Sequence, residues 1–137
     1  MAYLIGVVLA ITVCGIATIV RFDRDRAFYP TLTIVIASYY ALFAVMGGST
    51  RALMQESVVI TGFFLIAIIG FKRNLWLIVV ALAAHGVFDF VHGNVIADPG
   101  VPAWWPAFCL AYDVVTAAYL AVLLLRARIP ASAPVGR

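Results

Sequence analysis

Two histidines and an aspartate lie within eight residues of one another in the stretch "AAHGVFDFVHGN", residues 83–94. His85, Asp89 and His92 are spaced i, i+4 and i+7, so on a helix their side chains form one stripe. Imidazole nitrogen and carboxylate oxygen are ligands that suit zinc, iron or manganese. The spacing therefore predicts a metal site on one face of a helix.

Two acidic residues from other apolar segments, Glu56 and Asp113, are candidates to complete this site. Ligands at i and i+7 rise about 10 Å apart along a helix and do not easily share one ion. We therefore expect an inner ligand set of His85, Asp89 and Asp113, and we expect His92 to be a further metal ligand or an entrance residue. Glu56 is the predicted general base.

The composition places these residues in a membrane protein. Only 11% of the 137 residues are charged, whereas soluble domains have roughly 25%. The mean hydropathy is +1.12, and the partner implied is the lipid bilayer. The net charge of +3 does not indicate nucleic-acid binding, because the basic residues are not clustered with aromatic residues. Cys14 and Cys109 lie in apolar segments and have neither disulfide-framework nor zinc-finger spacing.

Five segments are long enough to cross a bilayer as helices, which takes about 17–25 mostly apolar residues each. The sequence predicts an all-α integral membrane bundle in one domain, residues 1–126, followed by a polar cytoplasmic tail at 127–137. The first segment lacks the basic start and the cleavage site of a signal peptide, so we expect it to be retained. The predicted spans are roughly 3–20, 30–47, 52–71, 74–92 and 105–125.

Lysine and arginine predict the orientation, since they are enriched in cytoplasmic loops. With five spans, every basic residue except Arg51 falls on one side of the membrane. We therefore expect the N-terminus outside and the C-terminus in the cytoplasm, in a multi-pass protein of a bacterial inner membrane. The residues on the cytoplasmic side would be Arg21, Arg24, Arg26, Lys72, Arg73, Arg126, Arg128 and Arg137.

The same topology brings the ionisable residues of the spans to one depth, in the outer half of the membrane. A charged side chain at the bilayer centre costs about 2.5–3.5 kcal/mol, so these groups must be paired, protonated or bound to a cation. A structural network is one alternative, with His85 bonded to an aspartate and Arg51 paired with Glu56. An ion path is another, although the cytoplasmic halves of the spans are apolar.

The pattern His-x3-Asp-x2-His followed by Cys-x3-Asp resembles one found in uncharacterised small bacterial multi-span membrane proteins. Here it comprises His85, Asp89 and His92, and then Cys109 and Asp113, in the last two spans. The resemblance implies no particular activity. A looser similarity to membrane hydrolases with a His/Asp/Ser zinc site implies a reaction class only, because this chain lacks their His-x3-His pair and their seven spans.

These patterns lead to one main functional hypothesis and two alternatives. As an enzyme, the protein would be a metal-dependent hydrolase or oxidase acting on a lipid-soluble substrate, with residues 94–106 as a lid. As a non-catalytic protein, it would be a subunit or partner of a larger membrane complex, or a homo-oligomer. As a transporter, it would move protons or metal ions.

Overall fold

The computed structural model describes residues 1–133 and confirms the all-α fold with five helices. All five are long and apolar enough to cross a membrane. Their bounds are α1 Ala2–Val20, α2 Phe28–Met46, α3 Thr50–Lys72, α4 Trp76–Val95 and α5 Trp105–Leu125.

Turn residues explain where several helices begin and end. Arg21 adopts a left-handed conformation (φ 68°) after α1, and the next amide bonds back to the Ala17 carbonyl, which closes the helix. Gly48 has a φ of +66° in the turn between α2 and α3, and the Ser49 hydroxyl then caps α3 by accepting a hydrogen bond from the Ala52 amide. Pro106 lies in the first turn of α5, where its missing N–H leaves no hydrogen bond unmade.

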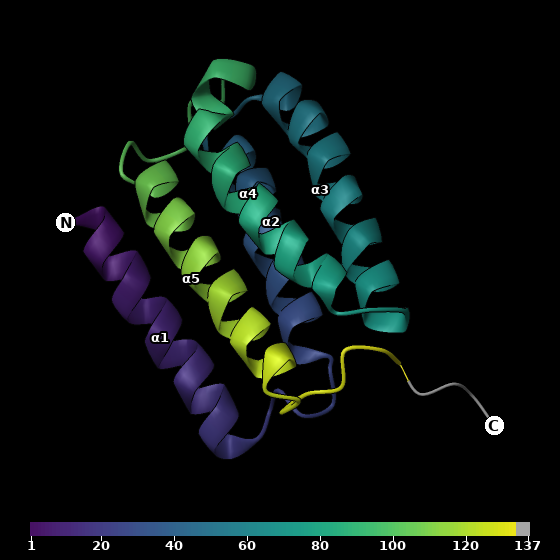
Figure 1. Cartoon of the computed structure of the whole chain (residues 1–137). Coiled ribbons are helices and arrows are strands. Elements are labelled where there is room, and N and C mark those ends of the chain that lie inside the picture. The colour runs from purple at the N-terminus through teal and green to yellow at the C-terminus, as the bar shows by residue number, and fades with distance from the viewer. Residues whose placement is uncertain (134–137) are drawn as a thin grey trace.

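The helices form an antiparallel bundle in which α5 lies between α1 and α4, and α2 and α3 pack on the other side of α4 (Figure 1). A stripe of small buried residues on α1 allows its close contact with α5: Gly6, Ala10, Cys14 and Ala17. At Gly6 a Cβ atom would lie 2.5 Å from the Phe108 carbonyl oxygen, so no side chain fits there.

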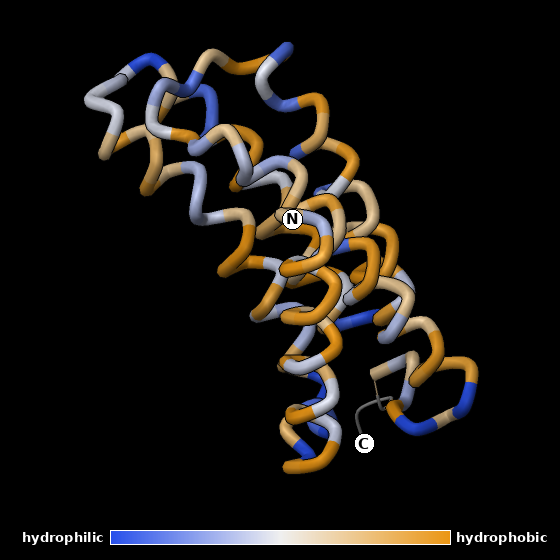
Figure 2. The backbone as a smooth tube through the Cα atoms, turned by 90° about the vertical axis from the view of Figure 1, so that its left-hand side faces the viewer, coloured by the Kyte–Doolittle hydropathy of each residue, from blue (hydrophilic) through white to orange (hydrophobic). Residues whose placement is uncertain are grey.

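The two ends of the bundle differ in charge. Figure 2 shows apolar residues along the spans and hydrophilic ones gathered toward the ends. Every lysine and arginine of residues 1–133 except Arg51 lies at the last residue of α3 or after α1, α3 or α5, at the end opposite to the N-terminus. Arg137 lies outside the described residues. The arrangement matches the charge distribution that five spans require, and the direction in the membrane stays a prediction.

The segment after α5 folds back onto the bundle as far as Ala133. The Leu75 amide donates to the Ala131 carbonyl at 2.8 Å, and the buried Ile129 is 2% exposed. The Arg26 guanidinium donates to the carbonyls of Pro130 and Phe71. The first part of the expected tail is therefore packed against the basic end of the bundle, and residues 134–137 lie outside the described part of the chain.

Candidate metal centre

Three predicted ligands meet at the interface of α4 and α5. The Nδ1 atom of His85 lies 2.7 Å from Oδ2 of Asp113 and 3.4 Å from Oδ2 of Asp89. The three side chains are 2%, 0% and 0% exposed, and one ligand atom from each lies within 4.8 Å of the others. We call His85, Asp89 and Asp113 the triad.

A glycine next to His85 lets the two helices approach closely enough to form the triad. A Cβ atom at Gly86 would lie 3.1 Å from Cβ of Asp113 and 3.3 Å from the Leu110 carbonyl oxygen. Both contacts are tighter than ordinary van der Waals distances, so a larger residue would push α5 and its aspartate away. In the sequence, the only signal of this role of Gly86 is a glycine beside a candidate ligand.

The remaining two predicted site residues form a separate pair between α3 and α4. Nε2 of His92 lies 2.6 Å from Oε1 of Glu56, and the side chains are 2% and 1% exposed. The ring of Tyr40 from α2 stacks on His92, with centroids 4.2 Å apart, and its centroid is 6.4 Å from that of His85. The structure thus brings four helices together around the predicted residues, but it does not place His92 or Glu56 among the triad.

Aromatic rings pack against both histidines, each of which is 2% exposed. Phe63 meets His85 edge to face with centroids 4.7 Å apart, and Phe88 meets His92 in the same way at 5.6 Å. The triad therefore lies in a low-dielectric setting, in which charges interact strongly and unpaired charges are costly.

The acidic groups outnumber the basic ones at this site. Three carboxyl groups face two imidazoles, and within residues 1–133 no lysine or arginine makes an ion pair with them. The structural alternative paired Arg51 with Glu56, and this pairing is wrong, because Arg51 is exposed and Glu56 bonds to His92 instead. Even with both imidazoles protonated, one negative charge would remain for a proton or a cation to neutralise.

Several buried oxygen atoms at the site have no hydrogen-bond partner. They are both carboxyl oxygens of Asp89, Oδ1 of Asp113, Oε2 of Glu56 and the Tyr40 hydroxyl. The Tyr40 hydroxyl and the Cys109 thiol lie near the Asp89 carboxyl group, but neither has the geometry of a hydrogen bond to it. Burying an unsatisfied polar group costs about 1–3 kcal/mol, so oxygens of this kind indicate a missing partner. A cation bound by the triad would provide that partner for Asp89.

The separations within the triad suit a small divalent cation. Ligand atoms that lie about 2.0–2.2 Å from a tetrahedral metal stand roughly 3.3–3.6 Å apart. The 3.4 Å between His85 and Asp89 matches this separation, and the 2.7 Å between His85 and Asp113 would have to open by several tenths of an ångström. Three protein ligands leave a coordination position open, as catalytic metal sites do.

A hollow at the end of the bundle that carries the N-terminus leads toward His92. It has a volume of about 230 Å³ and is lined by His92, Asp98 and apolar residues of the segment between α4 and α5. This segment forms most of the wall of the hollow beside His92 and packs against the end of α2, since Gly100 lies against the Phe43 carbonyl and Gly47. His92, expected at the mouth, is thus buried beneath the hollow.

Other polar residues at similar depth do not join the site. Ser38, Ser57 and Thr61 are exposed, and each hydroxyl donates to a carbonyl of its own helix one turn earlier.

Comparison with protein-family models, curated proteins and solved structures finds no match to this chain. The resemblance to small bacterial membrane proteins therefore stays a prediction.

Proposed function

We propose that the protein is a membrane metalloprotein whose triad binds one divalent cation, zinc, iron or manganese, in the half of the bundle that faces outward in the expected topology. The observation that carries this proposal is the convergence of His85, Asp89 and Asp113, whose ligand atoms lie within 4.8 Å of one another. All three side chains are buried, and the nearby basic groups are too few to balance the carboxylates. Zinc, iron and manganese all accept mixed nitrogen and oxygen ligands, so the ligand types do not select among them.

The chemistry that such a site supports best is metal-dependent hydrolysis or oxidation of a lipid-soluble substrate. A cation held by His85, Asp89 and Asp113 would supply the activation of water or dioxygen, and the aromatic surroundings would keep bulk water away from it. Glu56 acts as general base in this proposal, with His92 holding its carboxylate at 2.6 Å. In this proposal, water enters the site through the hollow above His92, and protons leave by the same route.

Elemental analysis of the purified protein, after growth with each metal, tests the proposal. We expect about one metal ion per chain in the wild type and in Asp25→Asn, an exposed aspartate at the opposite end of the bundle. Asp113→Asn keeps the shape of the side chain and should lose the metal. Circular dichroism and gel filtration establish that each variant is folded.

The possible outcomes separate the site from a structural network. A folded wild type that takes up no zinc, iron or manganese would overturn the proposal and leave a hydrogen-bonded network. Metal that persists in Asp113→Asn but disappears in Glu56→Gln would contradict the triad as the binding site. For the enzymatic part, wild-type protein should convert a component of a membrane lipid extract, detected by mass spectrometry, and Asp113→Asn should not.

A further inference from the structure

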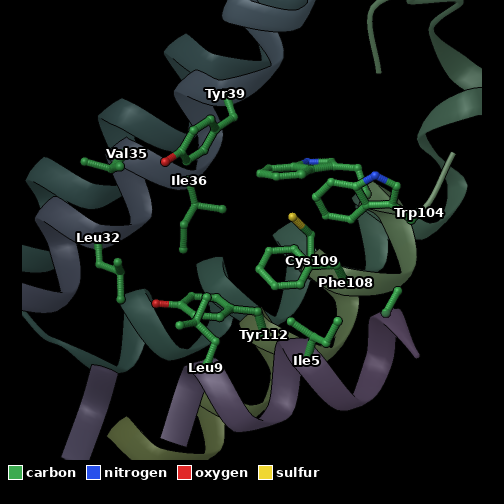
Figure 3. Close-up of a pocket in the computed structure, with 12 residues that line it drawn as sticks. Ile5, Leu9, Leu32, Val35, Ile36, Tyr39, Trp104, Phe108, Cys109 and Tyr112 are labelled. Carbon is green, nitrogen blue, oxygen red and sulfur yellow. The ribbon is translucent and has the colours of Figure 1, made fainter. Parts of the chain in front are cut away.

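We propose that a groove between α1 and α2 binds one hydrocarbon chain of a lipid. The part of the hydrocarbon chain that lies over Cys109 would then be beside the metal centre. The inference rests on the proposed function, because it identifies the substrate class as a lipid with an acyl or isoprenoid chain. We call this feature the chain groove. It is lined by α1, α2 and α5 and has a volume of about 490 Å³ (Figure 3).

The lining of the chain groove is almost entirely apolar. Ile5 and Leu9 come from α1, and Leu32, Val35 and Ile36 come from α2. The aromatic residues Trp105, Phe108 and Tyr112 come from α5, and Trp104 directly precedes that helix. Several of these side chains are strongly exposed in the bundle, for example Ile5 at 55% and Val35 at 47%. An apolar hollow of this kind does not hold ordered water, so in a bilayer hydrocarbon fills it.

The size of the chain groove favours a single hydrocarbon chain of a lipid over a helix of a partner protein. An α-helix with its side chains is about 10–12 Å wide and rises 5.4 Å per turn. A volume of about 490 Å³ therefore holds about one turn of a helix, which is too little for a stable helix–helix contact. A flexible hydrocarbon chain can follow the groove along its whole length.

Aromatic residues at one end of the chain groove indicate where the head of the lipid lies. The ring of Trp105 contacts those of Tyr39 and Phe108, with centroids 5.2 Å and 5.5 Å apart, and Trp104 stands beside it. Tryptophan is enriched at the membrane–water interface. The polar head of the lipid would therefore lie at the Trp104 end, with the chain running toward Leu32 in the interior.

Cys109 connects the chain groove to the triad. Its sulfur atom points into the groove in Figure 3. The same side chain is a neighbour of the Asp89 carboxyl group and stands one helical turn before Asp113. One small side chain thus separates the groove from the metal centre, and a chain lying over Cys109 is the part of the lipid nearest to the triad.

Photo-crosslinking tests the chain groove directly. The protein is reconstituted in vesicles of phosphatidylethanolamine and phosphatidylglycerol that contain a phospholipid with a diazirine in its acyl chain, and the adducts are mapped by mass spectrometry. We expect adducts on Val35, Tyr39 and Phe108 at several times the yield found on lipid-facing residues outside the groove, such as Val87. Equal yields at both kinds of position would overturn the inference.

Two matched pairs of variants make the assignment specific. Ile5→Trp fills the groove, whereas Ile11→Trp enlarges a residue of the same helix that is 53% exposed and outside the groove. We expect Ile5→Trp to lower the groove adducts at least fivefold and Ile11→Trp to leave them unchanged. Val35→Trp and Val45→Trp repeat the comparison on α2, in case the first pair does not fold. Groove adducts that persist in both filled variants would contradict the inference.

The design separates failure of the inference from failure of the proposed function. Crosslinking requires no bound metal, so Asp113→Asn should retain the groove adducts while it loses the metal. Groove adducts on a protein that binds no metal would support the chain groove and contradict the metal site. A metal-loaded protein without preferential groove adducts would contradict the chain groove alone.

Discussion

Nδ1 of His85 lies 2.7 Å from Oδ2 of Asp113 across the interface of α4 and α5, at the height where Gly86 lets the two helices touch. The same nitrogen lone pair can hold either a proton shared with the aspartate or a metal ion. The relationship therefore defines two states of the site, a protonated network and a metal complex. Their competition leads to the first prediction.

Metal binding should release protons. Because the ligand groups must be deprotonated to coordinate a cation, the affinity for zinc should rise about tenfold per pH unit for each proton displaced. Calorimetric titration with zinc in two buffers of different ionisation enthalpy measures the number of protons released. A zinc affinity that does not change between pH 6 and 8 would contradict the idea that a proton and a metal ion compete for Nδ1 of His85.

Gly86→Ala should weaken metal binding more than it weakens the fold. Overpacking a tight contact costs about 1–3 kcal/mol, which the better helix propensity of alanine offsets by about 1 kcal/mol. Displacement of Asp113 by the added methyl should raise the Kd for zinc several-fold. Gly62→Ala is the matched control, because a Cβ atom at Gly62 meets nothing within 4 Å. Equal zinc affinity in the two variants would show that Gly86 does not position the triad.

The Glu56–His92 pair should contribute to stability independently of the metal. Removing one partner of a buried hydrogen-bonded pair leaves the other unsatisfied at a cost of about 1–3 kcal/mol, so Glu56→Leu should lower the free energy of unfolding in detergent by about this amount. The double variant Glu56→Leu/His92→Leu should recover much of the loss, because no buried polar group is then left without its partner. Additive losses in this double-mutant cycle would mean that the two residues are not coupled. Glu56→Gln should still bind one metal ion.

Arg26 should hold the segment after α5 against the bundle. Its guanidinium bonds to carbonyls of Pro130 and Phe71, and Arg26 is 5% exposed. We expect Arg26→Gln to increase cleavage between residues 126 and 133 by a protease several-fold, because these bonds are lost. Arg24→Gln, at an exposed arginine of the same loop, should leave the cleavage rate unchanged. Similar rates in both variants would argue against a clamp at Arg26.

The basic end of the bundle should face the cytoplasm. A fluorescent protein fused after Arg137 should fluoresce in bacteria, and alkaline phosphatase inserted at Gly48 should be active, since that enzyme requires the periplasm. The physical reason is the excess of lysine and arginine at the end that carries Lys72 and Arg126. The opposite pattern of reporter activity would invert the predicted topology.

The amino-acid sequence alone determined the fold class, and it identified the buried ionisable residues among which a site could form. Five apolar segments of membrane-spanning length lead to five helices, because a chain in lipid must satisfy its backbone hydrogen bonds within each span. The cost of an isolated charge in lipid in turn implies that Asp89, Asp113 and Glu56 face one another or a partner inside the bundle. The helical rise along each span predicts that they lie at similar depth.

Only the tertiary structure decided how these residues divide. Depth follows from position along a helix, whereas the direction of a side chain toward one neighbour or another depends on how the helices rotate and pack. Packing at Gly86 brings Asp113 to His85, while α3 presents Glu56 to His92. The chain groove could not be foreseen for the same reason: it is the space left where α1 and α2 do not meet, and no local pattern encodes it.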